Sequence, residues 1–174
     1  MNDLNHRETN TPAYILLAIF LLSFVLLFHS MSALAWTGKV VGIADGDTIK
    51  VLHDNKAIRI RLYGIDTPEK RQAFGNRAKK YTNAMVRGKK VDIDPITKDR
   101  YGRTVAMVHI HGTNLNQALI QAGYAWVYRK YCKKDICEGW YQDEEQARNA
   151  GRGLWHDPYP TPPWIWRKIK RNQK

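Results

Sequence analysis

Alternation of apolar and polar residues is the dominant pattern between residues 36 and 110. Thr48 to Val51 alternates polar and apolar side chains, as a half-buried strand does. Ile58 to Tyr63 alternates again, and a period of two puts Ile58, Ile60 and Leu62 on one face. Asp45-Gly46 separates the first two apolar runs and is a strong hairpin-turn pair. The predicted strands lie at 40–43, 48–51, 58–63, 91–93 and 102–110.

Three later segments have helical spacing instead. Apolar residues recur at helical intervals between Glu69 and Arg87, and Gly88 follows as a stop signal. Asn114 is a suitable N-cap for a short helix at Leu115 to Ala122. Glu138 to Asn149 is acidic early and basic late, as the helix dipole favours. Five short strands with about three helices predict an α+β domain.

The first 35 residues differ from the rest of the chain. Ala13 to Phe28 is an almost unbroken apolar run, and Ala33-Leu34-Ala35 provides the small residues of a cleavage site. The residues before the run carry both acids and bases, so they are not clearly basic. The uncharged stretch from Pro12 to Lys39 is long enough to span a bilayer if it is not cleaved. Residues 1–35 are therefore interpreted as a signal peptide or a membrane anchor.

Either interpretation places the folded part outside the cytoplasm. We expect a secreted or periplasmic protein, or alternatively one attached to the membrane through residues 13–35 with its domain facing outward. Residues 36–156 are expected to form one folded domain. Residues 157–174 contain four of the seven prolines and five basic residues, and are expected to form an extended basic tail. The chain has no internal repeat, and a monomer without a protein partner is the expectation.

Charge narrows the choice of partner. The chain has 28 Lys and Arg against 16 Asp and Glu, a formal net charge of +12. Residues 1–35 have a net charge of −1, so the remainder carries +13. A potential this positive attracts polyanions. Nucleic acid is the first polyanion to consider, and an anionic membrane surface is the second.

Cys132 and Cys137 are the only cysteines. In an exported protein such a close pair indicates a disulfide that closes a loop. The alternative is two free surface thiols. No cluster of Cys and His has zinc-finger spacing.

Acidic side chains gather at two predicted turns. Asp66 ends a predicted strand, and Pro68 bends the chain after it, so that Asp66 and Glu69 converge. Asp45 and Asp47 lie at the other turn and supply a further carboxylate. Such oxygen ligands suit Ca²⁺ or Mg²⁺, with water and a backbone carbonyl completing the shell.

Two arginines on predicted strands complement these carboxylates. Arg61 projects from one strand, and Arg103 stands at the start of another. A guanidinium group donates two hydrogen bonds to phosphate oxygens, on which charge builds during nucleophilic attack. A metal adds Lewis-acid polarisation, and a carboxylate that the metal does not fully use can orient or deprotonate the attacking water. Together these groups predict phosphoryl chemistry.

Three motifs, in the order in which they occur along the chain, resemble those of the staphylococcal nuclease (thermonuclease) family. They are DGDT at 45–48, RLYGIDTPE at 61–69 and DRYGR at 99–103. The segments at 114–128 and 147–155 look like helices of that family, so the similarity covers roughly residues 38–155. It implies a five-stranded OB-fold barrel with helices. It also implies calcium-dependent hydrolysis of DNA and RNA, in which water attacks phosphorus and leaves 3′-phosphate ends.

The resemblance also implies roles for the acidic motif residues. Asp47 and Asp66 would be carboxylate ligands of Ca²⁺, and Thr67 would offer its backbone carbonyl. Glu69 would contact the metal-bound water and act as a base or water-positioning group.

The remaining implied roles concern the substrate. Arg61 and Arg103 would clamp the phosphate and stabilise the transition state. Tyr101 would lie beside the substrate, and Arg100 is a further substrate-binding candidate. An ungapped match puts Arg129 where the family has a second substrate-side tyrosine, so Tyr128 or Tyr131 is expected to replace it. The loop at Lys70 to Gln72 is also shorter than in the type enzyme.

Two other functions compete with an active nuclease. One is a non-catalytic nucleic-acid-binding OB-fold module, and the other is an adaptor that uses the barrel as a scaffold. A binding module has no need for Asp47, Asp66 and Glu69, because their negative charges repel phosphate without a metal. The complete set of three carboxylates and two arginines therefore favours the enzyme.

Overall fold

The computed structural model describes residues 34–173. The apolar run at 13–28 lies outside these residues, so its interpretation as a signal peptide or anchor stays a prediction. In the described part of the chain, no helix combines the length and the apolar character needed to cross a membrane.

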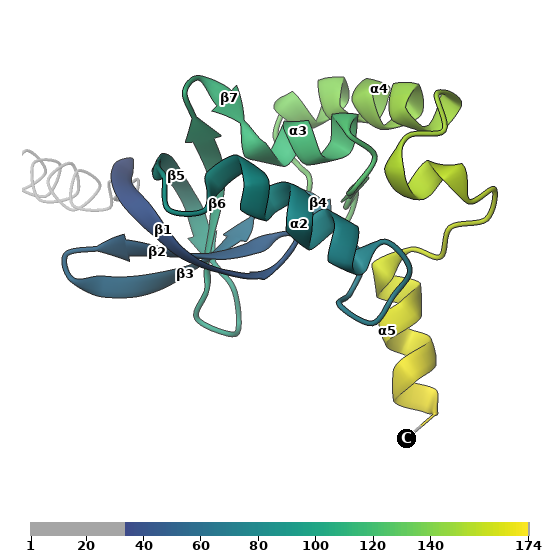
Figure 1. Cartoon of the computed structure of the whole chain (residues 1–174), viewed down its shortest axis with the longest axis horizontal. Coiled ribbons are helices and arrows are strands. Elements are labelled where there is room, and N and C mark those ends of the chain that lie inside the picture. Colours follow the sequence, from purple (N-terminus) through teal and green to yellow (C-terminus); the bar gives the residue numbers. More distant parts are fainter. Residues whose placement is uncertain (1–33, 174) are drawn as a thin grey trace, which may run out of the picture. The chain divides into compact units, whose positions relative to one another are not determined.

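The strands form a closed barrel (Figure 1). Its sheet has the order β3-β2-β1-β5-β6-β7, and an additional parallel pairing of β3 with β6 closes it, with Ile60 opposite Thr104. Closure removes the free strand edges of an open sheet. The predicted α+β fold with a five-stranded OB-like barrel is thus confirmed. The strands are β1 (Trp36–Asp45), β2 (Thr48–His53), β3 (Lys56–Leu62), β5 (Lys90–Lys98), β6 (Thr104–Ile110) and the short β7 (Thr113–Asn114).

The core follows the alternation in the sequence. Ile60 and Leu62 are buried on β3, and Ile49 and Val51 are buried beside them on β2. Each of these side chains contributes about 1.5–3 kcal/mol by leaving water. Arg61, between the two buried residues of β3, points to the opposite face, where it remains available for the site.

Helices cover one side of the barrel and extend beyond it (Figure 1). They are α2 (Gly75–Val86), α3 (Leu115–Gln121), α4 (Ile136–Asn149), the 3₁₀ helix η1 (Gly153–His156) and α5 (Pro163–Asn172). The first predicted helix begins at Gly75 rather than near Glu69, because the segment from Pro68 to Phe74 folds as a loop. Gly75 passes so close to the carbonyl oxygen of Glu69 that a side chain there would clash with it.

The extended tail predicted after residue 157 is wrong for its last part. Residues 163–172 form α5, a helix of ten residues. Pro163 occupies the first turn, where a missing N–H costs nothing, and Lys170 and Arg171 lie in the last turn, where the dipole favours cations. The prolines therefore start a helix rather than exclude one.

A short two-stranded sheet connects the barrel to α5. β4 (Ile65–Asp66) pairs antiparallel with β8 (Trp126–Val127). A small buried cluster around Trp126 and Trp155 packs beside it, and Trp164 of α5 packs against that cluster. The side-chain amide of Gln72 also donates a hydrogen bond to the carbonyl of Thr161. These contacts hold α5 against the loop before α2.

Candidate active site

The turn between β1 and β2 brings Asp47 to Thr67. The backbone N–H of Thr67 donates a hydrogen bond to Oδ2 of Asp47 at 2.8 Å. Gly46 lies so near that a Cβ there would be 2.8 Å from Oγ1 of Thr67. A side chain at position 46 would therefore push the two segments apart. Asp47, Asp66 and Thr67 are all buried.

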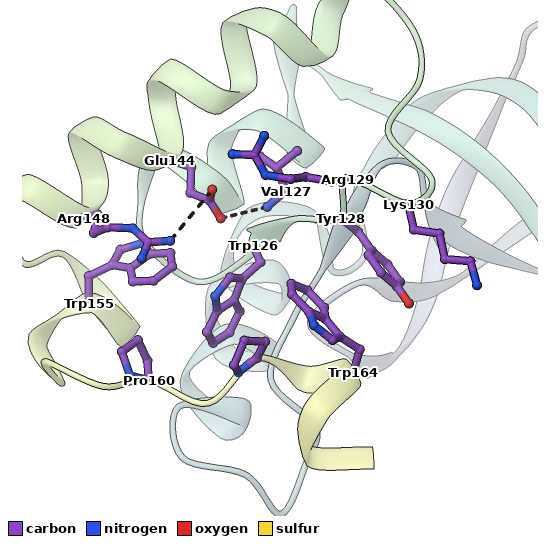
Figure 2. Close-up of a pocket in the computed structure, with 11 residues that line it drawn as sticks. Trp126, Val127, Tyr128, Arg129, Lys130, Glu144, Arg148, Trp155, Pro160 and Trp164 are labelled. Atoms are coloured by element: carbon purple, nitrogen blue, oxygen red, sulfur yellow. Dashed lines mark hydrogen bonds and ion pairs between the residues drawn. The ribbon is translucent and has the colours of Figure 1, made fainter. Parts of the chain in front are cut away.

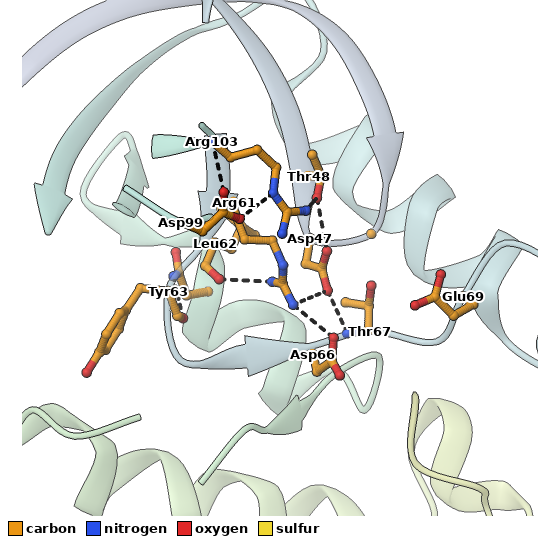
Figure 3. Close-up of polar contacts among 12 residues, drawn as sticks. Asp47, Thr48, Arg61, Leu62, Tyr63, Asp66, Thr67, Glu69, Asp99 and Arg103 are labelled. Carbon is orange, nitrogen blue, oxygen red and sulfur yellow. Dashed lines mark hydrogen bonds and ion pairs between the residues drawn. The ribbon is translucent and has the colours of Figure 1, made fainter. Parts of the chain in front are cut away.

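Arg61 lies between two carboxylates (Figure 3). Its Nη2 is 3.1 Å from Oδ2 of Asp47 and 2.8 Å from Oδ1 of Asp66. Its Nη1 donates to the carbonyl of Leu62 at 3.0 Å. The strand β3 thus delivers one guanidinium group to two acids that are 19 positions apart in the sequence.

Arg103 joins the same site through a chain of hydrogen bonds (Figure 3). Its Nη1 donates to Oγ1 of Thr48 at 3.4 Å, and this hydroxyl donates to Oδ1 of Asp47 at 3.2 Å. Its Nε is 2.6 Å from Oδ2 of Asp99. Although partial burial acts the other way, hydrogen bonds from Arg103 and Tyr101 lower the pKa of Asp99. Asp99 therefore stays charged and orients Arg103, a role that sequence reasoning did not assign.

The carboxylates crowd one another in a partly dry environment. Burial raises the pKa of Asp45 to about 7, and the neighbouring Asp47 adds to the shift. Burial also raises the pKa of Asp66 to about 6, while Arg167 and Arg61 oppose the shift. Among the described residues, Oδ1 of Asp45 is one of three buried side-chain atoms without a hydrogen-bond partner. A bound cation would therefore offset the repulsion among these carboxylates.

The available ligands suit a hard divalent cation. Asp47, Asp66 and Glu69 offer carboxylate oxygens, Thr67 offers a backbone carbonyl, and the partnerless oxygen of Asp45 lies in the same turn as Asp47. Such an all-oxygen set matches Ca²⁺ or Mg²⁺. As the side chains stand within residues 34–173, no three acidic, His or Cys groups already surround one point. The donor chemistry fits a metal, and the carboxylates are held by guanidinium groups.

Arg167 is the residue that the sequence analysis missed. Its Nη2 is 2.7 Å from Oδ2 of Asp66, and its Nη1 is 2.7 Å from Oε1 of Glu69. Despite the opposing effect of burial, these bonds raise the pKa of Arg167. Arg167 lies outside the three motifs, in the segment assigned to a tail. The signal that could have found it is the Pro162-Pro163 pair before Trp164 and Trp166, which is a typical helix start.

The predicted substrate-side residues fall into two groups. Tyr101 is 65% exposed, and its ring lies under the guanidinium of Arg103 at 5.6 Å. Arg100 donates to the hydroxyl of Tyr101 at 2.7 Å, so both lie beside Arg103. Tyr128 and Tyr131 contact each other edge to face at 4.9 Å, and Tyr128 also stacks on α5. The structure therefore does not gather the predicted tyrosines in one place.

Cys132 and Cys137 are joined by a disulfide with their Cα atoms 5.8 Å apart. The hydroxyl of Tyr63 accepts hydrogen bonds from the backbone N–H groups of Lys133 and Lys134. The bridge and these bonds tie the loop after β8 to the barrel.

Comparison with known proteins agrees with this geometry. Residues 59–157, more than half of the chain, match the family described as staphylococcal nuclease homologue. A protein of Escherichia coli O157:H7 described as an uncharacterized endonuclease is 40% identical over 158 residues, covering 90% of this chain and 98% of the relative. A micrococcal nuclease of Shigella flexneri is 40% identical over 154 residues, covering 82% of this chain and 88% of the relative.

A more distant relative shares only the domain. The staphylococcal-like nuclease CAN1 of Arabidopsis thaliana is 39% identical over 116 residues, which cover 67% of this chain and 35% of that protein. The barrel, the ordered motifs and these matches agree. The chain therefore belongs to the staphylococcal nuclease family of nucleic-acid-hydrolysing enzymes.

Proposed function

We propose that this nuclease uses Ca²⁺ to hydrolyse phosphodiester bonds of both DNA and RNA, leaving 3′-phosphate ends. The observation that carries the proposal is the placement of Arg61 between Asp47 and Asp66, with Arg103 linked to the same group through Thr48. The carboxylates beside these arginines repel a phosphate, and a bound cation would offset that repulsion.

Asp47, Asp66 and the carbonyl of Thr67 are the groups that would hold the metal. When bound, Ca²⁺ supplies Lewis-acid polarisation of a phosphoryl oxygen. The two buried carboxylates bring the charge needed to retain a divalent ion in competition with water.

Arg61 and Arg103 would bind the non-bridging oxygens of the phosphate. A guanidinium fork fits two of these oxygens at once, and its hydrogen bonds strengthen as negative charge builds in the transition state. Asp99 keeps Arg103 oriented through the contact at 2.6 Å. Asp66 and Asp47 do the same for Arg61.

Glu69 is the proposed base or water-positioning residue. Its side chain is 38% exposed, so water reaches it. The oxygen of the water forms a bond to phosphorus while one proton passes to Glu69. The bond from phosphorus to the 5′-oxygen breaks and this oxygen takes a proton from solvent water, leaving a 3′-phosphate and a 5′-hydroxyl, while Glu69 returns its proton to solvent. A carboxylate with a water-accessible oxygen suits this task.

The protein is also proposed to act outside the cytoplasm. The apolar run at 13–28, the Ala-Leu-Ala motif and the disulfide support export. Fractionation of cells that express the full chain tests this. Activity found only in the cytoplasmic fraction would contradict it.

Digestion by the purified full chain tests the activity. Single-stranded DNA, double-stranded DNA and RNA are each incubated with Ca²⁺, with Mg²⁺ and with chelator. We expect cleavage that requires Ca²⁺ and leaves 3′-phosphate ends. Glu69→Gln should lower kcat by about two to four orders of magnitude, the usual contribution of a general base. The matched control Glu145→Gln, an exposed position on α4, should keep full activity.

Two results would change this proposal. Binding of nucleic acid without cleavage in any metal would favour the non-catalytic OB-fold module. Full activity of Glu69→Gln would remove Glu69 from the mechanism while leaving the nuclease assignment intact.

A further inference from the structure

An aromatic face lies next to the acidic site. Asp66 of β4 and Trp126 of β8 are direct cross-strand partners, so their side chains project from the same face of the two-stranded sheet. The backbone N–H of Tyr128 donates to the carbonyl of Gly64 at 2.7 Å, which continues this pairing beyond β8. Tyr128 is two positions after Trp126 and therefore projects from that face as well.

A cleft of about 540 Å³ opens on this face (Figure 2). Its walls are formed by Trp126 and Tyr128, by Trp155 of η1, and by Trp164 with Pro160 and Pro162. The volume lies within the range of roughly 300–1,000 Å³ that is typical of small-ligand sites. Tyr128 is a substrate-binding candidate from the sequence, whereas the tryptophans and prolines of the cleft have no role in the proposed chemistry.

The aromatic rings of the cleft support one another. The ring of Trp164 stacks on Tyr128 with an interplanar angle of 9° and a centroid distance of 5.0 Å. Trp126 meets Trp155 edge to face at 5.2 Å and Trp164 at 6.4 Å. Mutual packing fixes the ring positions before any ligand arrives, which lowers the entropic cost of binding.

Cations surround the rings, and the acidic side chain among them is paired with one of these cations. Arg129, Lys130 and Arg148 line the cleft and are exposed. Glu144, the acidic residue that lines it, accepts a hydrogen bond from the N–H of Val127 and lies 4.0 Å from Arg148. An aromatic cleft with a positive rim matches a planar, uncharged ring that is attached to phosphates.

The helix α5 joins this cleft to the acidic site. Trp164 and Arg167 are three positions apart and share one side of the helix. Arg167 contacts Asp66 and Glu69, while Trp164 contacts Tyr128. Their backbone positions are about 4.5 Å apart along the helix axis, so α5 places the cleft beside the carboxylates that Arg167 contacts. This position suits a nucleotide next to the phosphate that is cleaved.

We propose that the cleft is a nucleobase subsite that receives an unpaired base flanking the scissile phosphate. The proposal rests on the proposed nuclease function of the neighbouring site. Stacking on aromatic rings tolerates any base, because every base has a π-face. The base must be unpaired to enter, so the subsite favours single-stranded or frayed substrate over intact duplex.

Oligonucleotide binding tests the subsite without catalysis. A short, fluorescently labelled single strand is titrated into the full chain in chelator, and a series of strands carries one abasic position each. Base stacking is worth about 1–3 kcal/mol, so one abasic position should weaken binding roughly 5- to 150-fold. Trp164→Ala should weaken binding of the intact strand to a similar extent. In that variant the abasic position should cost nothing further.

Two further variants separate stacking from folding. Trp166→Ala removes a tryptophan of the same helix that contacts Lys170 and does not line the cleft, so it should bind as the wild type does. Trp164→Phe keeps an aromatic face and should recover most of the affinity. Thermal unfolding of each variant shows whether the domain is intact.

The outcomes distinguish the subsite from the nuclease assignment. The subsite is overturned if the wild type tolerates an abasic residue at every position, or if Trp164→Ala keeps the same abasic penalty. Cleavage by the wild type together with either result would leave the nuclease function standing. A position-specific abasic penalty in a protein that cleaves no nucleic acid would support the subsite and refute the nuclease function.

Discussion

Replacing Arg167 by glutamine should have opposite effects on the metal-free and metal-bound protein. In the metal-free protein, Arg167 holds Oδ2 of Asp66 and Oε1 of Glu69, each at 2.7 Å. The Arg167 side chain is 40% exposed, so solvent screens these pairs, and their contribution to stability is about 1 kcal/mol. Arg167→Gln should therefore lower Tm in chelator by about 2–4 °C.

Metal binding should change in the other direction. A divalent cation that uses the carboxylates of Asp66 and Glu69 competes with the guanidinium group for the same oxygens. If the ion pairs of about 1 kcal/mol are given up on binding, their removal tightens Ca²⁺ binding about fivefold. Because a ligand stabilises the native state by RT ln(1 + [L]/Kd), the calcium-induced rise in Tm should be larger in the variant.

Thermal unfolding across a calcium titration measures both effects at once. Lys168→Gln is the matched control, because Lys168 is the exposed neighbour on α5 and makes no ion pair within the described residues. It removes the same charge and should change neither quantity. A smaller calcium effect in Arg167→Gln would refute the competition, since Arg167 would then help to hold the ligands in place.

Two further perturbations test the buried charge and the disulfide. Burial raises the pKa of Asp45 from 3.8 to about 7, so the folded state holds a proton that the unfolded state has released between these values. The stabilisation from this retained proton is complete below about pH 4 and is lost as pH rises through about 7. Asp45→Asn should therefore flatten the fall of Tm over this pH range in chelator. An unchanged Tm profile would exclude titration of Asp45 in this range. Reduction of Cys132–Cys137 should cost about 2 kcal/mol and speed proteolysis of the loop, and equal protease resistance with and without reductant would contradict this.

Local sequence patterns predicted the barrel strands, because strand formation and the tight turns depend on neighbouring residues. Alternation at Thr48 to Val51 and the Asp45-Gly46 turn depend on neighbouring residues only. Closure depends instead on the pairing of Ile60 with Thr104, which lie 44 positions apart. The motif resemblance, rather than periodicity, predicted the barrel.

The C-terminal segment shows where prediction from local patterns failed. Prolines at positions 158 to 163 and the following basic residues are typical of an extended tail. The helix α5 forms because Trp164 packs against Trp126 and Tyr128, and because Arg167 pairs with Asp66 and Glu69. These partners lie between 36 and 101 positions earlier in the chain, so they are invisible to a local pattern.

The sequence by itself therefore determined the family, the main barrel strands, the helices α2, α3 and α4, and the acidic and basic motif residues. Each of these features depends on a short sequence segment rather than on contacts between distant residues. The tertiary structure alone decided that Arg61 lies between Asp47 and Asp66 and that α5 reaches the site. Such convergence follows from barrel closure and from the packing of α5 on the β4–β8 face, where residues far apart in the chain become neighbours.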